Sequence, residues 1–203
     1  MSCVVTAYYS IQKTIFFIAL FIFAVKGFGQ IPSSGLYGDL ILFRNNDNHT
    51  IDGYFKSSTS DGRFTCLFEF KGTYKNLSDK LINVTALWPD DEMTREGLLI
   101  CISNNSFVLK FNESLPGSMA CSGVDSETGS EFELQKNKEW LGIKIVKSER
   151  AYFFKEPIDE TKCKAYITKY DAVGIIERKN DWLLVEYYGL KLTLGWIKLT
   201  DFY

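Results

Sequence analysis

The stretch NDWLLVEYYGLKLTLGWIKLTDFY, residues 180–203, indicates a β-sheet structure. Its apolar and aromatic residues fall into two short runs separated by Gly189, and neither run has the 3.6-residue period of an amphipathic helix. Trp182 opens the first run and Trp196 closes the second. The two indoles either fill the core of a small barrel or form a surface that binds a ligand.

The same alternation of apolar and polar residues continues through the rest of the chain. Turns rich in Asn, Asp, Ser and Gly separate the runs, which is typical of an antiparallel sandwich or barrel. The predicted strands of the first half are 36–43, 51–57, 63–72, 80–88, 97–103, 106–111, 130–136 and 141–147. We therefore predict an all-β protein. An N-terminal antiparallel β sandwich or barrel (residues 30–143) packs closely against a C-terminal small barrel (residues 144–203), because no linker separates the two patterns.

Residues 1–29 are predicted to be a secretory signal peptide. Lys13 precedes an apolar run of 12 residues, 14–25, and Gly27 and Gly29 supply the small residues before a cleavage site at Gln30. A membrane anchor is the less favoured alternative, because a spanning helix needs about 20 apolar residues. We expect an exported protein, periplasmic or secreted, with no stable membrane span after cleavage.

Charge is spread unevenly but is nowhere strongly positive. Residues 30–143 carry 10 basic and 16 acidic side chains, and residues 144–203 carry 11 basic and 9 acidic side chains. Nucleic-acid binding needs a concentrated basic face. We therefore expect no nucleic-acid partner.

Four cysteines follow the predicted signal peptide, and an even number in an oxidising compartment suggests disulfides. Alternation in RFTCLFEF turns Cys66 toward a core, and Cys121 lies in a Gly- and Ser-rich stretch that a tether would restrain. A Cys66–Cys121 bridge would close a loop of about 55 residues and stabilise the fold by about 4 kcal/mol. The alternative is buried free thiols, which suits Cys101 in particular, whereas Cys163 is expected to be exposed and unpaired.

Residues 144–203 resemble the bacterial SH3-like (SH3b) domain at three separated places. Residues 169–171 (KYD) stand where the family has Lys-Gly-Asp, and residues 180–182 (NDW) stand where it has Gly-Asp-Trp or Gly-Gly-Trp. Residues 195–197 (GWI) match its closing Gly-Trp-Ile/Val, which a short 3₁₀ segment follows. The resemblance implies a compact five-stranded barrel. It departs at residues 151–157, where many members have Leu-Asn-Val-Arg and Ser-Gly-Pro, and that loop often shapes the family's ligand groove.

This resemblance implies that Trp196 caps the barrel core. The predicted core of the barrel is Val173, Ile175, Leu184, Val185, Leu192 and Leu194. More aromatic residues are present than such a core can hold, and exposed aromatics beside lysines suit sugar or peptide recognition. The candidate ligand-binding residues are Tyr152, Phe154, Tyr166, Trp182, Tyr187 and Tyr188. Consecutive residues of a strand face opposite sides, so Tyr187 and Tyr188 should not share a face.

No catalytic or metal-binding pattern is evident. The chain has one histidine, His49, in a polar turn, and the acidic pair Asp90–Asp91 lies in a Pro-led turn that reads as solvated. We expect no cofactor, no metal and no enzymatic activity. The favoured function is binding of a bacterial envelope component, namely a wall peptide, a glycan or another exported protein. The alternative is an inhibitor or immunity-type protein whose acidic N-terminal half blocks a wall-degrading enzyme, and a degenerate wall hydrolase ranks last.

Overall fold

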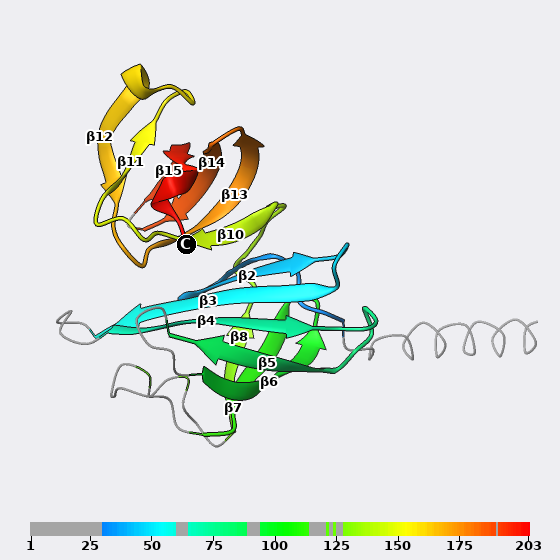
Figure 1. Cartoon of the computed structure of the whole chain (residues 1–203). Helices are drawn as coiled ribbons and strands as arrows, with labels where there is room; N and C mark the ends of the chain where they lie inside the picture. Colours follow the sequence, from blue (N-terminus) through cyan, green and yellow to red (C-terminus); the bar gives the residue numbers. More distant parts are fainter. Residues whose placement is uncertain are drawn as a thin grey trace, which may run out of the picture.

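The computed structural model describes residues 30–59, 65–88, 94–113, 121, 124, 128–189 and 191–203. The predicted signal peptide and the Asp90–Asp91 pair lie outside the described residues. The described strands form two separate antiparallel sheets, of nine and six strands, so the all-β prediction is confirmed (Figure 1). We call them sheet A and sheet B.

Strands β1 to β8 of sheet A form a meander in which each strand pairs with the one before it, and β9 pairs with β1, which gives the order β8-β7-β6-β5-β4-β3-β2-β1-β9. Its strands are β1 (Gly35–Tyr37), β2 (Leu40–Asn45), β3 (Thr50–Ser58), β4 (Thr65–Thr73), β5 (Leu81–Leu87), β6 (Thr94–Ser103), β7 (Ser106–Phe111), β8 (Ser130–Glu133) and β9 (Lys136–Asn137). The predicted run 36–43 is a hairpin rather than one strand, because the chain turns at Gly38, whose φ of 70° suits glycine.

One short segment joins the two edges of sheet A. Strand β8 pairs with β7, and β9, which begins three residues after β8 ends, pairs with β1 at the opposite edge. Between them, the Leu134 amide donates to the Asn105 carbonyl and the Gln135 amide donates to the Leu36 carbonyl. The sheet therefore curls into a barrel-like shape around one core.

Aromatic side chains fill the interior of sheet A. The buried rings are Tyr37, Phe55, Phe68, Phe70, Tyr74, Phe107, Phe111 and Phe132. Ile31 is buried in the same core at one end of the barrel, where its amide donates to the Leu77 carbonyl. Cys121 and Val124 are buried in this core as well, and a disulfide joins Cys121 to Cys66 of β4, as predicted from the sequence.

Sheet B has the strand order β10-β13-β14-β15-β11-β12. Its elements are β10 (Gly142–Ile145), β11 (Ala151–Phe154), the 3₁₀ turn η1 (Asp159–Thr161), β12 (Lys162–Ile167), β13 (Ala172–Lys179), β14 (Trp182–Tyr188), β15 (Leu192–Lys198) and the 3₁₀ turn η2 (Leu199–Asp201). The predicted run 141–147, which was assigned to the first half, forms β10 and pairs with β13. Sheet B thus begins at Gly142, two residues before the predicted boundary, and has six strands rather than five.

The core of sheet B differs from the predicted core, chiefly because the opposite face of β15 is buried. Val173 and Val185 are buried as predicted, and Ile175 packs partly buried against this core. Leu184, in contrast, is half-buried on the outer face, and Leu192 and Leu194 are 49% and 59% exposed. Gly195 and Ile197 of β15 are buried instead, so the alternation of the strand turns Trp196 to the outer face, where it is half-buried. Trp196 therefore does not belong to the core that it was expected to cap. The buried residues of this core are Val146, Ala151, Phe153, Ile167, Val173, Leu183, Val185, Ile197 and Phe202.

Candidate functional site

Partly exposed aromatic side chains gather on the outer face of sheet B. Leu183 and Val185 of β14 face the core, which turns Trp182 to the outer face, directly opposite Lys198 of β15. Trp196 also lies on this face, and both Leu184 of β14 and Phe154 of β11 are its cross-strand partners.

Phe154, Trp182 and Trp196 form the centre of this face, which we call the aromatic cluster. The Phe154 and Trp182 rings meet edge to face at 4.8 Å. Phe154 is only 6% exposed, because its neighbours cover it, whereas both tryptophans are half-buried. The Lys198 ammonium lies 5.3 Å from the Trp182 ring centroid and also pairs with Asp159. This arrangement leaves two indole surfaces open to a ligand.

A second group, the tyrosine pair, lies beside the aromatic cluster on β11 and β12. Tyr152 and Tyr166 are cross-strand partners, and their ring centroids are 5.6 Å apart. The Lys162 ammonium lies 3.7 Å from the Tyr152 centroid, and the Arg150 guanidinium lies 5.0 Å from the Tyr166 centroid. A cation held over a ring face in this way gains a cation–π attraction. The tyrosine pair therefore presents positive charge together with aromatic surface.

Tyr188, another candidate ligand-binding residue, lies at the far end of the outer face in a polar cluster. Its hydroxyl donates to the Glu186 carboxylate at 3.1 Å. The same carboxylate accepts from Trp140 Nε1 at 3.0 Å and pairs with the Lys138 ammonium at 2.8 Å. These bonds attach the segment that leads into β10 to the surface of sheet B, so Tyr188 is engaged in holding the fold.

Tyr187 faces the opposite side of β14 from Tyr188, toward the core and sheet A. It packs against the core of sheet B and hydrogen-bonds with Asp171. Burial, with a further contribution from Asp171, raises the pKa of Tyr187 to about 12. The structure thus brings together four of the six candidate residues, Tyr152, Phe154, Tyr166 and Trp182, and places the tyrosines of β14 elsewhere.

The contact between the two sheets centres on Asp171, which is buried. Its carboxylate accepts hydrogen bonds from the Thr168 amide and hydroxyl and from the Lys56 ammonium of β3, the last at 2.7 Å. The Tyr54 hydroxyl of β3 donates to the Tyr170 carbonyl at 2.6 Å. Burial first, and the nearby Asp171 charge second, raise the pKa of Tyr54 well above its ordinary value. Since both links join β3 to one turn of sheet B, they fix how the sheets sit together.

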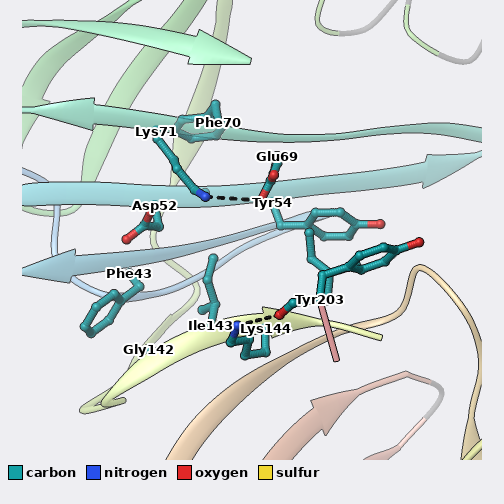
Figure 2. A pocket seen from close by; sticks show the side chains of 12 residues that line it. Phe43, Asp52, Tyr54, Glu69, Phe70, Lys71, Gly142, Ile143, Lys144 and Tyr203 are labelled. Carbon is teal, nitrogen blue, oxygen red and sulfur yellow. Dashed lines mark hydrogen bonds and ion pairs between the residues drawn. The ribbon is translucent and has the colours of Figure 1, made fainter. Parts of the chain in front are cut away.

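A cleft of about 300 Å³ lies beside this contact, between the outer face of sheet A and β10 (Figure 2). Asp52, Glu69 and Lys71 line it from sheet A, and Lys144 of β10 lines it from sheet B. The Lys71 ammonium nitrogen lies 3.8 Å from a carboxylate oxygen of Glu69. Burial raises the pKa of the Asp52 carboxyl, although the Lys71 charge opposes this shift. The charges of the cleft are balanced in sign, and none of the residues predicted to bind a ligand lies there.

No group of three or more His, Cys, Asp or Glu side chains could hold a metal ion among the residues that the structure describes. Across the same residues, no helix is both long enough and apolar enough to cross a membrane.

Comparison of the chain with family models, curated proteins and solved structures found no match. The class that the fold itself defines is an all-β protein of two packed antiparallel sheets.

Sequence reasoning missed the residues that connect the sheets and the two cations of the tyrosine pair. Lys56 and Asp171 lie 115 positions apart, and no local pattern marks either of them as a partner. Arg150 and Lys162 flank loops in which charged residues are ordinary. Only the pairing of β11 with β12 brings these two cations to neighbouring rings.

Proposed function

We propose that this chain is an exported, non-catalytic binding protein of the bacterial cell envelope, and that it binds through the outer face of sheet B. The observation that carries the proposal is the aromatic cluster beside the tyrosine pair, because five rings on four neighbouring strands share one face and four of them are partly exposed. Aromatic side chains with nearby cations are the groups that recognition surfaces favour. A wall peptide, a glycan or another exported protein are the candidate ligands.

Two further features support the proposal. A Cys66–Cys121 disulfide suits an oxidising compartment outside the cytoplasm. At two turns the backbone has the conformation that glycine favours, since Tyr170 and Asn180 have φ of 66° and 53° at positions where the SH3b family, which residues 144–203 resemble, usually has glycine. The 3₁₀ turn η2 also begins at Leu199, two residues after the end of the Gly-Trp-Ile motif.

Co-sedimentation with purified cell-wall sacculi tests this function. We expect the protein to be retained, and we expect Trp182→Ala and Trp196→Ala to weaken retention by about tenfold or more, as for residues at the centre of an interface. Leu81→Ala is the matched control, because Leu81 is an exposed apolar residue of sheet A. Thermal unfolding of each variant checks that sheet B remains folded.

Two results would count against the proposal. Retention unchanged in both tryptophan variants would exclude the aromatic cluster as the binding surface. Absence of retention, together with a loss of lysozyme activity when the protein is added, would favour the inhibitor alternative.

A further inference from the structure

Strand β12 is an open edge of sheet B. It is the last strand in the sheet order and pairs only with β11. In Figure 1 it lies on the outer side of sheet B, away from sheet A. The outward-facing N–H and C=O groups of an edge strand are available for pairing with another extended chain.

The side chains along this edge are basic and aromatic. Lys162 and Tyr166 both reach the Tyr152 ring, so they lie on the same side of β12. Lys164, midway between them, is exposed. Lysines on an edge strand discourage pairing with neutral or basic strands. The same charges favour a strand that carries carboxylates, since opposite charges on neighbouring strands attract.

The cations of this edge have no acidic partner within the described residues. No carboxylate lies within ion-pair distance of Arg150, Lys162 or Lys164 in the part of the chain that the structure describes. Lys198, on the neighbouring aromatic cluster, is instead neutralised by Asp159. Positive charge without a neighbouring carboxylate among the described residues therefore lies along β12, at Lys162 and Lys164.

We propose that β12 binds an extended acidic peptide, which adds to sheet B as a seventh strand. Backbone hydrogen bonds to the edge would supply affinity, and carboxylates at alternate positions of the peptide would meet Lys162 and Lys164. Strand addition of this kind takes specificity from alternate side chains. The inference rests on the proposed function, because the tyrosine pair belongs to the same binding face, and it names the ligand as a protein segment rather than a sugar.

The test uses a synthetic peptide of about eight residues, the usual length of a strand, with Glu at alternate positions and Thr or Val between them. Fluorescence anisotropy with the whole protein measures its binding. We expect a peptide with Gln in place of each Glu to bind about tenfold more weakly or worse, and binding of the acidic peptide to weaken as salt is raised. A third peptide, N-methylated at alternate residues along one edge, lacks the amide donors for strand pairing and should not bind.

Variants of the protein complete the test. The double variant Lys162→Glu and Lys164→Glu should lose binding of the acidic peptide, whereas Lys80→Glu, a charge reversal at an exposed lysine just before β5, should not. Equal binding of the N-methylated peptide, or equally tight binding of dextran sulfate, would overturn strand addition. No binding of the acidic peptide would overturn it as well. Sacculus retention that depends on Trp182 but not on Lys162 and Lys164 would leave the proposed function intact and refute only this inference.

Discussion

Glu186 is a centre of hydrogen bonding on the outer face of sheet B, since its carboxylate accepts from Lys138, Trp140 and Tyr188. Burial alone would raise the pKa of Glu186, but hydrogen bonds from Lys138, Trp140 and Tyr188 outweigh it and hold that pKa below its ordinary value. The charged form is therefore favoured in the folded protein. A lowered pKa in the folded state means that the ionised group stabilises the fold.

Replacement of Glu186 tests this contribution. Glu186→Gln keeps the size of the side chain but leaves the Lys138 ammonium, which is 14% exposed, without its partner. We expect the free energy of unfolding near neutral pH to fall by about 1–3 kcal/mol. In the unaltered protein, this stabilisation should be fully present above the ordinary glutamate pKa, near 4.3, and should be lost as the pH falls through the lower folded-state pKa.

Urea unfolding at a series of pH values measures both effects. The variant should lose less stability than the unaltered protein over that acidic range. Glu177→Gln is the control, since Glu177 is an exposed glutamate on the neighbouring β13. An equal loss of stability on acidification in the Glu186 variant and the unaltered protein would contradict the assignment.

The pairing of β10 with β13 depends on a glycine under a tryptophan ring. A Cβ atom at Gly174 of β13 would lie 2.1 Å from the Trp140 ring, too close for any side chain. Gly174 therefore allows the indole to lie flat on the sheet and to reach Glu186. The neighbouring Gly142 of β10 has no such constraint, because its Cβ would meet only Ile175 at 3.5 Å.

These two glycines make a matched pair of substitutions. Gly174→Ala should displace Trp140 and lower the free energy of unfolding by about 1–3 kcal/mol, the usual cost of overpacking. Gly142→Ala should change stability by less than about 0.5 kcal/mol. Thermal or urea unfolding of the two variants gives the comparison. A similar effect of both substitutions would show that the Trp140 contact has no special role.

Elements were predictable from the sequence where alternation is regular and turns are polar. The run 106–111 matches β7 completely, and the alternation in RFTCLFEF placed Cys66 in the core, where its disulfide to Cys121 confirms the prediction. The sequence did not reveal which sheet the run 141–147 joins, because the partner of an edge strand is set by long-range packing. Leu192 and Leu194 were wrongly placed in the core, since alternation shows that two faces exist but not which one is buried.

In the whole molecule, two polar links hold sheet A against sheet B at one turn. Tyr54 bonds to the Tyr170 carbonyl, and Lys56 pairs with the buried Asp171. Neither link follows from local patterns, because each joins residues more than a hundred positions apart. The close packing of the two halves was nevertheless expected from the absence of a linker.

The double variant Tyr54→Phe and Lys56→Met tests the coupling of the sheets. It removes both links, leaves Asp171 without its cation, and should lower stability by about 2 kcal/mol. We expect the sheets to unfold in two steps in calorimetry, whereas the unaltered protein should unfold in one. Lys80→Met, at an exposed residue just before β5, should keep a single transition. One transition with an unshifted midpoint in the double variant would show that other contacts couple the sheets.

The segment that joins both edges of sheet A, residues 134–137, has a consequence for folding during synthesis. Leu36 pairs with Lys136, a hundred residues further along the chain. A polypeptide that is synthesised from its N-terminus therefore presents β1 long before β9, its partner on the outer side, has been made. Until then the outer edge of β1 is unpaired, and it can form a sheet with other unfolded chains nearby. The yield of native protein should depend on how quickly β9 follows β1, and on chaperones that cover the edge of β1 in the interval.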